Sequence, residues 1–424
     1  MKFSTYSPAE LKKPAQIQKT GDYRIEFQAF SAPENTDKTP VMFLGGAFQS
    51  FSSFRTEVEA MIPHCPVILA DMPSQGSNSQ LSPELEMDDF ADLIAGFLTA
   101  QGVDKVCLMG VSYGSAMATL FASRYPHMIE RLLLSGITCF RRDSLITLLE
   151  DSLQLLDSGD MDAFATSAVC SLINHNRIED TQISSTYRRL LWRQVARLND
   201  NERQRYAQNT RRLLRFRGFE SFPECETLIA TGEFDNFTLP QENAAVARQC
   251  RNARLAIIRN ADHLAQFEQK NASMELVSRF MLGLDLHTLP GVELFDPQAY
   301  DYANQRLQPR FRPLEQPYRL YDRATGKEHT VRIQDINFTG CALELNTADL
   351  SLTEDTRTLF LEIPETGYEY HVRILARDKK HVRCLIMQRD MAAAESLISY
   401  LNEHFLLIRD GDDRTAAQFS AQLA

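Results

Sequence analysis

The sequence lacks any long apolar run. No stretch approaches the roughly 18 consecutive apolar residues that an α-helix needs to cross a bilayer. Residues 1–10 also lack the apolar core and the small-residue cleavage site of a secretory signal peptide. We therefore expect a cytoplasmic protein with no transmembrane segment.

Paired cysteines are absent as well. The chain has eight cysteines, but none of them stands in a C-x-x-C motif, and several lie in apolar runs, as Cys107 does. Isolated cysteines in such runs are typical of buried thiols in a reducing compartment. Their spacing predicts neither a disulfide framework nor a zinc site, and we expect no bound metal.

An excess of positive charge is the third absence. Lys and Arg number 45 against 56 Asp and Glu, which gives a formal net charge of -11. Binding of a nucleic-acid polymer needs a positive surface, so we expect no nucleic-acid partner. The acidic balance still permits a local arginine pocket for a small phosphate ligand.

Short apolar runs alternate with helix-like segments over about residues 20–140, and two more such runs return between residues 227 and 259 of the 424-residue chain. Six of these runs are continuously apolar, which is typical of parallel strands covered by helices on both faces. The alternation predicts an α/β fold with a doubly wound, mostly parallel sheet, which we assign to residues 1–285. The six runs are residues 41–44, 67–70, 106–109, 132–134, 227–231 and 255–259.

The region at about 140–222 has helical periodicity and no strand-like run. We interpret it as a helical cap over an active site; the alternative is a set of peripheral helices. Residues 286–303 contain proline and show no clear period, so we expect a linker there.

The last third of the chain has a different pattern. Short stretches of alternating polar and apolar residues follow each other at regular spacing over residues 304–408, which predicts a small β-barrel. Residues 391–408 have the pattern of an amphipathic terminal helix. Residues 409–424 are small and polar, and we expect a loose tail there.

A candidate nucleophile follows the run at 106–109. Gly110, Ser112 and Gly114 match G-x-S-x-G, with a predicted strand before the motif and a predicted helix after it. That context is the one required for a nucleophile elbow, in which a strained turn raises the serine hydroxyl above the sheet edge at a helix N-terminus. The alternative is a plain turn.

A serine hydroxyl needs a base to become a nucleophile. In folds of this kind the order along the chain is Ser, then an acid, then His, each after a strand. His263 follows the run at 255–259, and Asp235 follows the run at 227–231. Glu233 and Glu226 compete with Asp235 for the role of the acid.

Two backbone N–H groups are needed to bind the oxyanion of an acyl-transfer intermediate. The first is that of Tyr113, directly after the nucleophile. The second should follow the first core strand, where Gly45 and Gly46 allow close approach of the backbone. We choose Ala47 as that donor, with Phe48 as the alternative.

Over residues 20–283 the chain resembles α/β-hydrolase fold enzymes. Four segments (41–48, 71–76, 232–235 and 261–268) look more narrowly like the acyltransferase family that makes 3-(3-hydroxyalkanoyloxy)alkanoates. That family esterifies one 3-hydroxyacyl group with the hydroxyl of another. The elbow differs, since the family departs from the first glycine of G-x-S-x-G.

Two motifs in the C-terminal region match those of the PilZ domain, a bacterial cyclic di-GMP receptor. Arg306 and Arg310 fit R-x-x-x-R, and the segment with Asp335, Asn337 and Gly340 fits [D/N]-x-[S/N]-x-x-G, with asparagine where serine is more usual. Arginines can fork onto phosphates and stack on guanine. The resemblance implies cyclic di-GMP as a regulatory ligand; the alternative is a set of surface cations beside a strand turn.

Together these patterns predict a serine-dependent acyl hydrolase or acyltransferase. Its substrate is expected to be an ester or thioester of a fatty or 3-hydroxyacyl group, with acyl carrier protein and CoA as candidate carriers of that group. Catalysis needs no cofactor, and cyclic di-GMP is expected to regulate it. The alternative is a catalytically idle hydrolase fold that acts as a cyclic di-GMP receptor.

Overall fold

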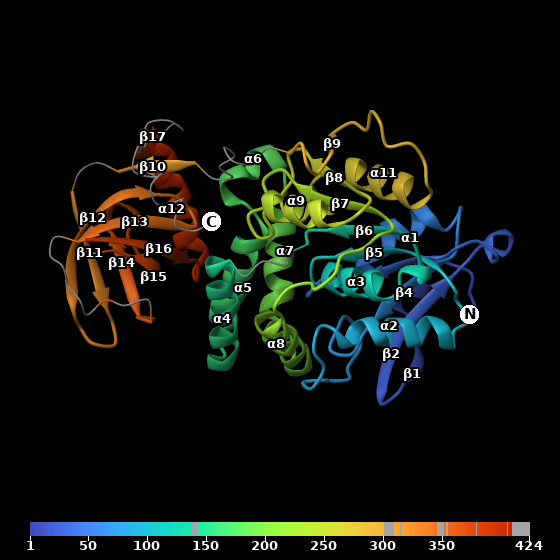
Figure 1. The fold of residues 1–424 in the computed structure, drawn as a ribbon. Helices are drawn as coiled ribbons and strands as arrows, with labels where there is room; N and C mark the ends of the chain where they lie inside the picture. The colour runs from blue at the N-terminus through green and yellow to red at the C-terminus, as the bar shows by residue number, and fades with distance from the viewer. Residues whose placement is uncertain are drawn as a thin grey trace. The chain divides into compact units, whose positions relative to one another are not determined.

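The computed structural model separates the chain into two compact units. The first, here called the sheet unit, contains Met1–Arg141, Glu179–Arg188 and Arg197–Tyr302; the second, the barrel unit, contains Arg142–Ile178, Arg189–Ala196 and Ala303–Ala424. Figure 1 labels the elements of both. The expected tail at 409–424 lies outside the residues that the structure describes. Those are 1–137, 142–300, 309–313, 316–345, 352, 355–378, 380–404 and 406–408.

Nine strands form one sheet in the described part of the sheet unit, in the order β1-β2-β4-β3-β5-β6-β7-β8-β9. The six strands from β4 to β8 in that order are parallel to their neighbours. β1, β2 and β9 pair antiparallel at the two edges. The bounds are β1 (Gln16–Thr20), β2 (Tyr23–Phe30), β3 (Val41–Leu44), β4 (Val67–Asp71), β5 (Val106–Val111), β6 (Ile129–Ser135), β7 (Glu226–Gly232), β8 (Ala253–Ile258) and β9 (Val292–Phe295).

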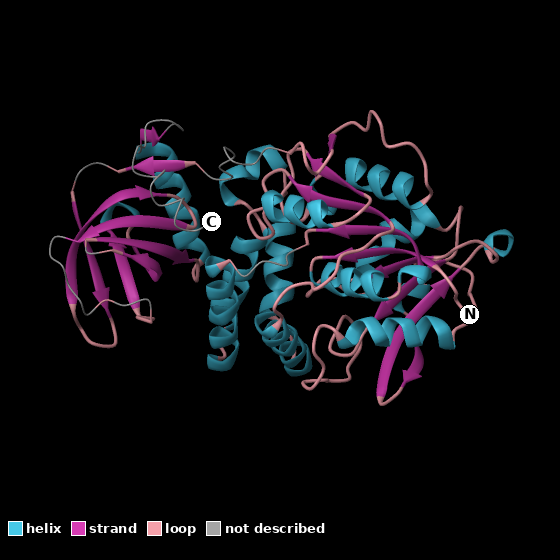
Figure 2. Cartoon of the chain, viewed as in Figure 1, coloured by secondary structure: helices cyan, strands magenta, loops and turns pink. Residues whose placement is uncertain are grey.

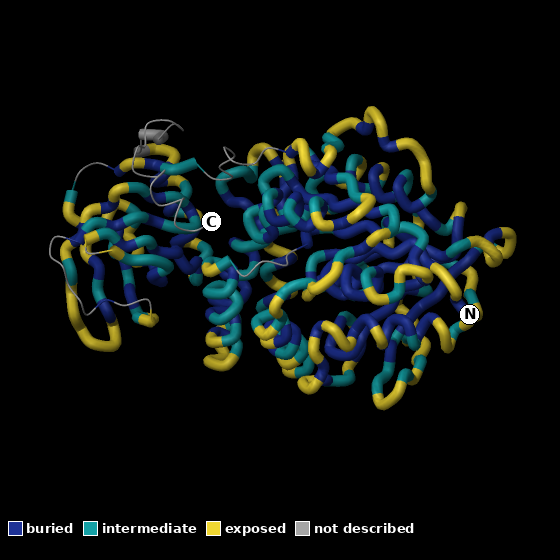
Figure 3. The backbone as a smooth tube through the Cα atoms, viewed as in Figure 1, coloured by how far each residue is buried: buried dark blue, intermediate teal, exposed yellow. Residues whose placement is uncertain are grey.

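The predicted α/β fold with a mostly parallel sheet is confirmed. Each of the six apolar runs forms one of the parallel strands, because a strand with helices on both faces is apolar along its whole length. Figure 3 shows these central strands as buried. β9 lies inside the segment expected to be a linker, so that part of 286–303 extends the sheet instead.

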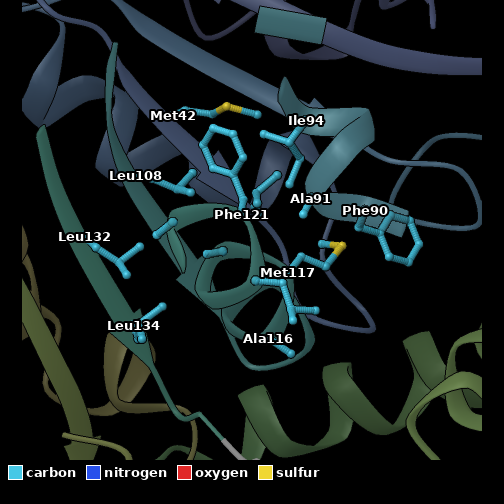
Figure 4. Close-up of a cluster of buried hydrophobic side chains, with 14 of the residues drawn as sticks. Met42, Phe90, Ala91, Ile94, Leu108, Ala116, Met117, Phe121, Leu132 and Leu134 are labelled. Carbon is cyan, nitrogen blue, oxygen red and sulfur yellow. The ribbon is translucent and has the colours of Figure 1, made fainter. Parts of the chain in front are cut away.

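Two hydrophobic clusters lie on the two faces of this sheet. One joins the strands to α2 (Asp89–Ala100), α3 (Tyr113–Arg124) and α9 (Pro240–Gln249), and the other joins them to α1 (Arg55–Met61) and α11 (Lys270–Met281). In Figure 4, Phe121 of α3 and Ile94 of α2 lie beside Met42 and Leu108 of the strands. None of the helices in the described ranges has the length and apolar composition of a membrane span.

The region between β6 and β7 is mostly helical where the structure describes it, and residues 216–225 form a loop that leads to β7 (Figure 2). Its contacts divide it between the two units: α4, α5 and most of α7 cluster with the barrel, and α8 clusters with the sheet. Its role as a cap stays a prediction. The helices are α4 (Asp143–Ser158), α5 (Met161–Leu172), α6 (Ile178–Thr181), α7 (Ser185–Ala196) and α8 (Asp200–Arg215).

The barrel unit contains a closed antiparallel barrel of six strands, in agreement with the predicted β-barrel. The strand order is β11-β14-β15-β16-β13-β12, and pairing of β12 with β11 closes it. Burial alternates along β12 and β13, as expected when one face packs on a core. The strands are β11 (Pro317–Asp322), β12 (Glu328–Ile336), β13 (Gly340–Leu345), β14 (Leu359–Ile363), β15 (Tyr368–Arg377) and β16 (His381–Met387).

The C-terminal helix is shorter than predicted. α12 (Met391–His404) ends four residues early, and β17 (Leu406–Ile408) pairs with β10 (Arg310–Arg312) instead. Pairing with an edge strand gives these last residues backbone hydrogen-bond partners that a frayed helix end would lack.

A buried ion cluster attaches α4 to the barrel within the barrel unit. The Asp151 side chain is fully buried, and its Oδ1 lies 2.5 Å from Arg389 Nη2 and 3.5 Å from Arg373 Nη2. Arg373 Nη2 also donates to Gln154 Oε1 at 3.0 Å. Helices α4 and α5 therefore form one body with the barrel, although they precede it by more than a hundred residues in sequence.

Candidate active site

A strained serine lies between β5 and α3. Ser112 has φ 50° and ψ -115°, a conformation that side chains rarely adopt. Its neighbours must be glycines: a Cβ on Gly110 would lie 2.5 Å from the Gly114 oxygen, and one on Gly114 would lie 2.3 Å from the Leu44 oxygen. Gly110 allows the first turn of α3 to lie against the end of β5, and Gly114 allows it to press against β3, which leaves the serine at the N-terminus of α3.

An imidazole faces this serine from another strand end. His263 Nε2 lies 3.2 Å from Ser112 Oγ, although the two residues are 151 positions apart. The His263 side chain is 5% exposed. β5, β7 and β8 are parallel, so the loops after them meet at one edge of the sheet. The structure thus brings together the predicted nucleophile and base.

Asp235 completes a hydrogen-bonded chain of three residues. Its Oδ2 lies 3.0 Å from His263 Nδ1, and its Oδ1 accepts from the backbone amides of Phe237 at 3.0 Å and Thr238 at 2.8 Å. The carboxylate is 1% exposed. A buried carboxylate held by several donors can fix one orientation and one tautomer of the imidazole.

The two competing carboxylates point elsewhere. Glu233 Oε1 accepts from Arg259 Nη1 at 2.6 Å. Glu226 Oε1 accepts from Arg254 Nη2 at 3.1 Å. Of the three acids considered from the sequence, the geometry places only Asp235 against the imidazole.

The environment of His263 favours its protonated form. Burial acts against the charged imidazole, but the charge of Asp235 and the hydrogen bond to it outweigh burial, and the neighbouring Asp262 adds to their effect. The net result is a raised pKa for His263. Such an imidazole can take the proton of a serine hydroxyl and hold it while the acyl group is attacked.

The loop after β3 borders the serine. A Cβ on Gly46 would lie 3.2 Å from Ser112 Cβ. The Gly46 amide donates to Gln49 Oε1 at 2.8 Å, whereas no acceptor among the described residues is bonded to the Ala47 amide. The Tyr113 amide, at the first position of α3, has no intrahelical acceptor. Both amides chosen from the sequence are thus available to an oxyanion.

Thr238 is a residue of the site that sequence reasoning missed. Its Oγ1 donates to Asp235 Oδ2 at 2.7 Å and lies 3.1 Å from His263 Nδ1. The only sequence signal is a threonine three residues after an aspartate, which is common in loops and points to no particular role.

Arg212 of α8 was also missed. The side chain is almost fully buried, and it donates to the Leu85 and Ser82 carbonyls, each at 2.6 Å, and to Tyr113 Oη at 3.2 Å. It therefore ties α8 to the residue that follows the nucleophile. No sequence rule separates this arginine from the others in its helix.

The candidate nucleotide-binding residues lie in the barrel unit, except that Arg306 falls outside the described residues. Arg310 of β10 pairs with Asp335 of β12, with Nη1 and Oδ2 3.1 Å apart. The Asn337 side-chain oxygen accepts from the Thr339 and Gly340 amides at 3.0 and 2.8 Å. The asparagine thus closes the turn of its own motif. Arg310 and Asp335 are neighbours, and Asn337 and Gly340 share one turn.

Comparison with known protein families gives one match that spans more than half of the chain. The alpha/beta hydrolase fold family matches residues 39–270. The match contains the elbow, the acid and the histidine, and it ends before β9.

Two characterised bacterial proteins are similar to this chain over most of their length. The (R)-3-hydroxydecanoyl-ACP:CoA transacylase of Pseudomonas putida is 25% identical over 286 residues, which cover 62% of this chain and 88% of that protein. The (E)-2-((N-methylformamido)methylene)succinate hydrolase of Acinetobacter baylyi is 23% identical, and the match covers 57% of this chain and 91% of that protein.

Solved structures show the same fold. An alpha/beta hydrolase enzyme from a Medee basin deep-sea metagenome library superposes with a TM-score of 0.56 at 19% identity, covering 64% of this chain and all of that chain. The likeness is one of fold, and it covers a share of this chain similar to that of the matched transacylase.

Proposed function

The chain belongs to the α/β-hydrolase fold family, and from that premise we propose that it is a serine enzyme that transfers acyl groups through an acyl-Ser112 intermediate. The observation that carries this proposal is the chain of contacts from Ser112 Oγ to His263 Nε2 at 3.2 Å and from His263 Nδ1 to Asp235 at 3.0 Å. The three groups have the order and spacing that nucleophilic catalysis by serine requires.

In the proposed reaction, His263 takes the Ser112 proton as the hydroxyl oxygen attacks the acyl carbonyl. The amides of Ala47 and Tyr113 bind the tetrahedral oxyanion, and loss of one such donor typically costs about 3 kcal/mol of transition-state stabilisation. Asp235 stabilises the imidazolium. The proton then passes from His263 to the leaving alcohol or thiol. In the second step a water, a hydroxyl or a thiol attacks the acyl-Ser112 carbonyl while His263 takes its proton, and His263 returns that proton to Ser112 Oγ as the serine is released.

The proposed substrate is an ester or thioester of a fatty or 3-hydroxyacyl group. A relative whose name gives transfer of a 3-hydroxydecanoyl group from ACP to CoA supports an acyl thioester. A relative named as a hydrolase supports water as an alternative acceptor. Both outcomes share the same acyl-serine and differ only in what attacks it.

The test is a panel of acyl esters and acyl thioesters with product identification by mass spectrometry. We expect wild-type protein to form an adduct with a fluorophosphonate probe and to turn over at least one substrate class. Ser112→Ala should lose labelling and at least about 10⁴-fold in rate. Retained turnover in that variant would refute the proposal, and a wild type that neither labels nor turns over any substrate would favour the idle receptor.

We further propose that the barrel binds cyclic di-GMP and thereby regulates acyl transfer. The supporting observation is the ion pair of Arg310 with Asp335, the first residue of the motif whose turn Asn337 and Gly340 close. A phosphate would compete with Asp335 for the Arg310 guanidinium, so binding would rearrange this ion pair.

Calorimetric titration with cyclic di-GMP tests the second proposal. We expect binding to wild type, and a loss of at least tenfold in affinity in Arg306→Ala and Arg310→Ala. Arg319→Ala, which removes an exposed arginine of the same barrel, serves as the control and should bind as wild type does. Absence of binding to wild type would refute the proposal and leave the enzyme assignment untouched.

A further inference from the structure

Helix α7 carries a concentration of positive charge in a chain of net charge -11. Residues 181–199 contain four arginines and no aspartate or glutamate. Two of them, Arg189 and Arg193, lie four positions apart and therefore on the same side of the helix, one turn from each other. Both are exposed.

The opposite side of α7 is anchored. Leu191 and Val195 are buried, and Trp192 Nε1 donates to Thr166 Oγ1 of α5 at 3.0 Å. The helix is thus fixed in rotation. The side that carries the arginines faces away from this packing.

Leu190 lies between the two arginines in sequence and is 57% exposed. We call Arg189, Leu190 and Arg193 the α7 stripe. It combines two cations with one exposed apolar side chain.

The stripe is costly for the helix that carries it. Like charges four residues apart destabilise a helix, and an exposed leucine gains nothing from burial. Over the ranges that the structure describes, no carboxylate lies within ion-pair distance of Arg189 or Arg193. An arrangement that opposes the stability of its own helix and leaves its charge uncompensated is typical of a binding surface.

The first turn of α7, which clusters with the sheet unit, contacts the chain shortly after the predicted base. The Tyr187 ring packs against the Phe267 ring with centroids 5.0 Å apart, and Phe267 follows His263 by four residues. The stripe follows Tyr187 by two residues in the sequence and clusters with the barrel unit.

We propose that the α7 stripe docks an acidic carrier protein that delivers the acyl group as a thioester. The inference rests on the proposed acyl-transfer function. Two acidic proteins repel each other at long range, so a productive encounter needs a local cationic face. Carboxylates of the carrier would pair with Arg189 and Arg193 while an apolar side chain covers Leu190. A small anion alone would leave the leucine without a partner.

The test compares a carrier-bound substrate with a small one. Arg189→Glu/Arg193→Glu is assayed with 3-hydroxydecanoyl-acyl carrier protein and with a neutral p-nitrophenyl ester of the same acid. We expect kcat/KM for the carrier thioester to fall at least tenfold and kcat/KM for the ester to stay within twofold. Added salt should slow the wild type with the carrier thioester and leave the variant little changed.

Lys105→Glu/Arg251→Glu is the matched control, because it makes the same change in net charge at exposed positions elsewhere. It should match wild type on both substrates. Equal losses on both substrates in the α7 variant, no loss on the carrier thioester, or the same loss in the control would each overturn the proposal. The α7 variant is also assayed with 3-hydroxydecanoyl-CoA. A loss of kcat/KM confined to that substrate would overturn the proposal too, because it would assign the stripe to the phosphates of CoA.

A binding measurement separates this inference from the proposed function. Fluorescence anisotropy with labelled acyl carrier protein and the Ser112→Ala protein requires no turnover. We expect binding to this protein and at least tenfold weaker binding once Arg189→Glu and Arg193→Glu are added. Equal binding by both proteins overturns the docking surface even if the enzyme is active.

Discussion

At the scale of single residues, the candidate site depends on how many donors hold one carboxylate. Asp235 accepts from two backbone amides and from Thr238 as well as facing His263. Thr238 Oγ1 reaches both the acid and the imidazole, so it helps to set which oxygen of Asp235 meets the ring. Such secondary contacts fix geometry that the three principal residues alone would leave loose.

The raised pKa of His263 predicts a definite pH dependence. Only the neutral imidazole can act as the base, so kcat/KM should fall as the pH drops through the pKa of His263, which lies above the ordinary value of about 6.5. In Asp235→Asn the main charge that raises this pKa is gone. The acid limb should then shift to lower pH, while the rate falls by up to about 10⁴-fold.

The measurement is a kcat/KM profile from pH 5 to 9 on the best substrate of the panel. Glu233→Gln is the control, since Glu233 pairs with Arg259 and not with the imidazole. Its acid limb should stay in place. An acid limb of Asp235→Asn that coincides with that of the wild type would show that another group titrates.

At the scale of elements, the elbow depends on the close approach of α3 to β3. Gly114→Ala would put a methyl group 2.3 Å from the Leu44 oxygen, so the helix start or the strand end must shift. We expect a loss of about 2 to 3 kcal/mol in the free energy of unfolding. Activity should fall further, because the shift displaces the Tyr113 amide.

Chemical denaturation checks this expectation, with Gly45→Ala as the comparison. The nearest atom to an added methyl at Gly45 lies 3.2 Å away and belongs to a side chain, so the change in stability should be clearly smaller. Equal stabilities for Gly114→Ala and wild type would mean that the approach is less tight than the structure has it.

The strands that the sequence predicted and those that it missed differ in a physical way. Each central strand is an uninterrupted apolar run because helices cover both faces. β1 reads Gln-Ile-Gln-Lys-Thr and is mostly exposed, and β9 is only half-buried. Edge strands such as these carry polar residues and resemble loops. For this reason the sequence pattern of residues 292–295 predicts a linker, whereas the structure has strand β9 there.

The candidate site also contains residues that the sequence could predict and residues that it could not. Ser112, Asp235 and His263 could be placed because each follows a recognisable strand, and strand ends determine position in this fold. Thr238 and Arg212 could not, because their roles depend on which loop and which helix face the site. Tertiary contacts of that kind leave no local pattern in the chain.

At the scale of the whole molecule, Asp151 joins helix α4 to the barrel within the barrel unit. A fully buried carboxylate between Arg373 and Arg389 leaves two cations uncompensated if it is neutralised. We expect Asp151→Asn to lower the free energy of unfolding of the barrel unit by about 3 kcal/mol. The helical periodicity of residues 140–222 could not reveal that α4 packs on the barrel, because a period does not say which neighbour a helix packs against.

Hydrogen exchange of β15 and denaturant unfolding measure the effect. Glu150→Gln is the matched control: Glu150 pairs with Arg357 at 3.5 Å, and both side chains are more than 40% exposed. The free energy of unfolding of Glu150→Gln should fall by less than about 1 kcal/mol. If both variants unfold like the wild type, Asp151 does not hold α4 to the barrel.

The barrel unit is built from segments that are far apart in the sequence, so the ribosome synthesises them at different times. Asp151 and Arg389 are 238 positions apart, and at 5–20 residues per second their synthesis is separated by roughly 10–50 s. During that interval α4 and α5 have emerged while the strands that shelter them do not yet exist. In the nascent chain, the surface of α4 that later packs on the barrel is therefore exposed until the barrel strands are made. A chain truncated before the barrel would expose that surface permanently.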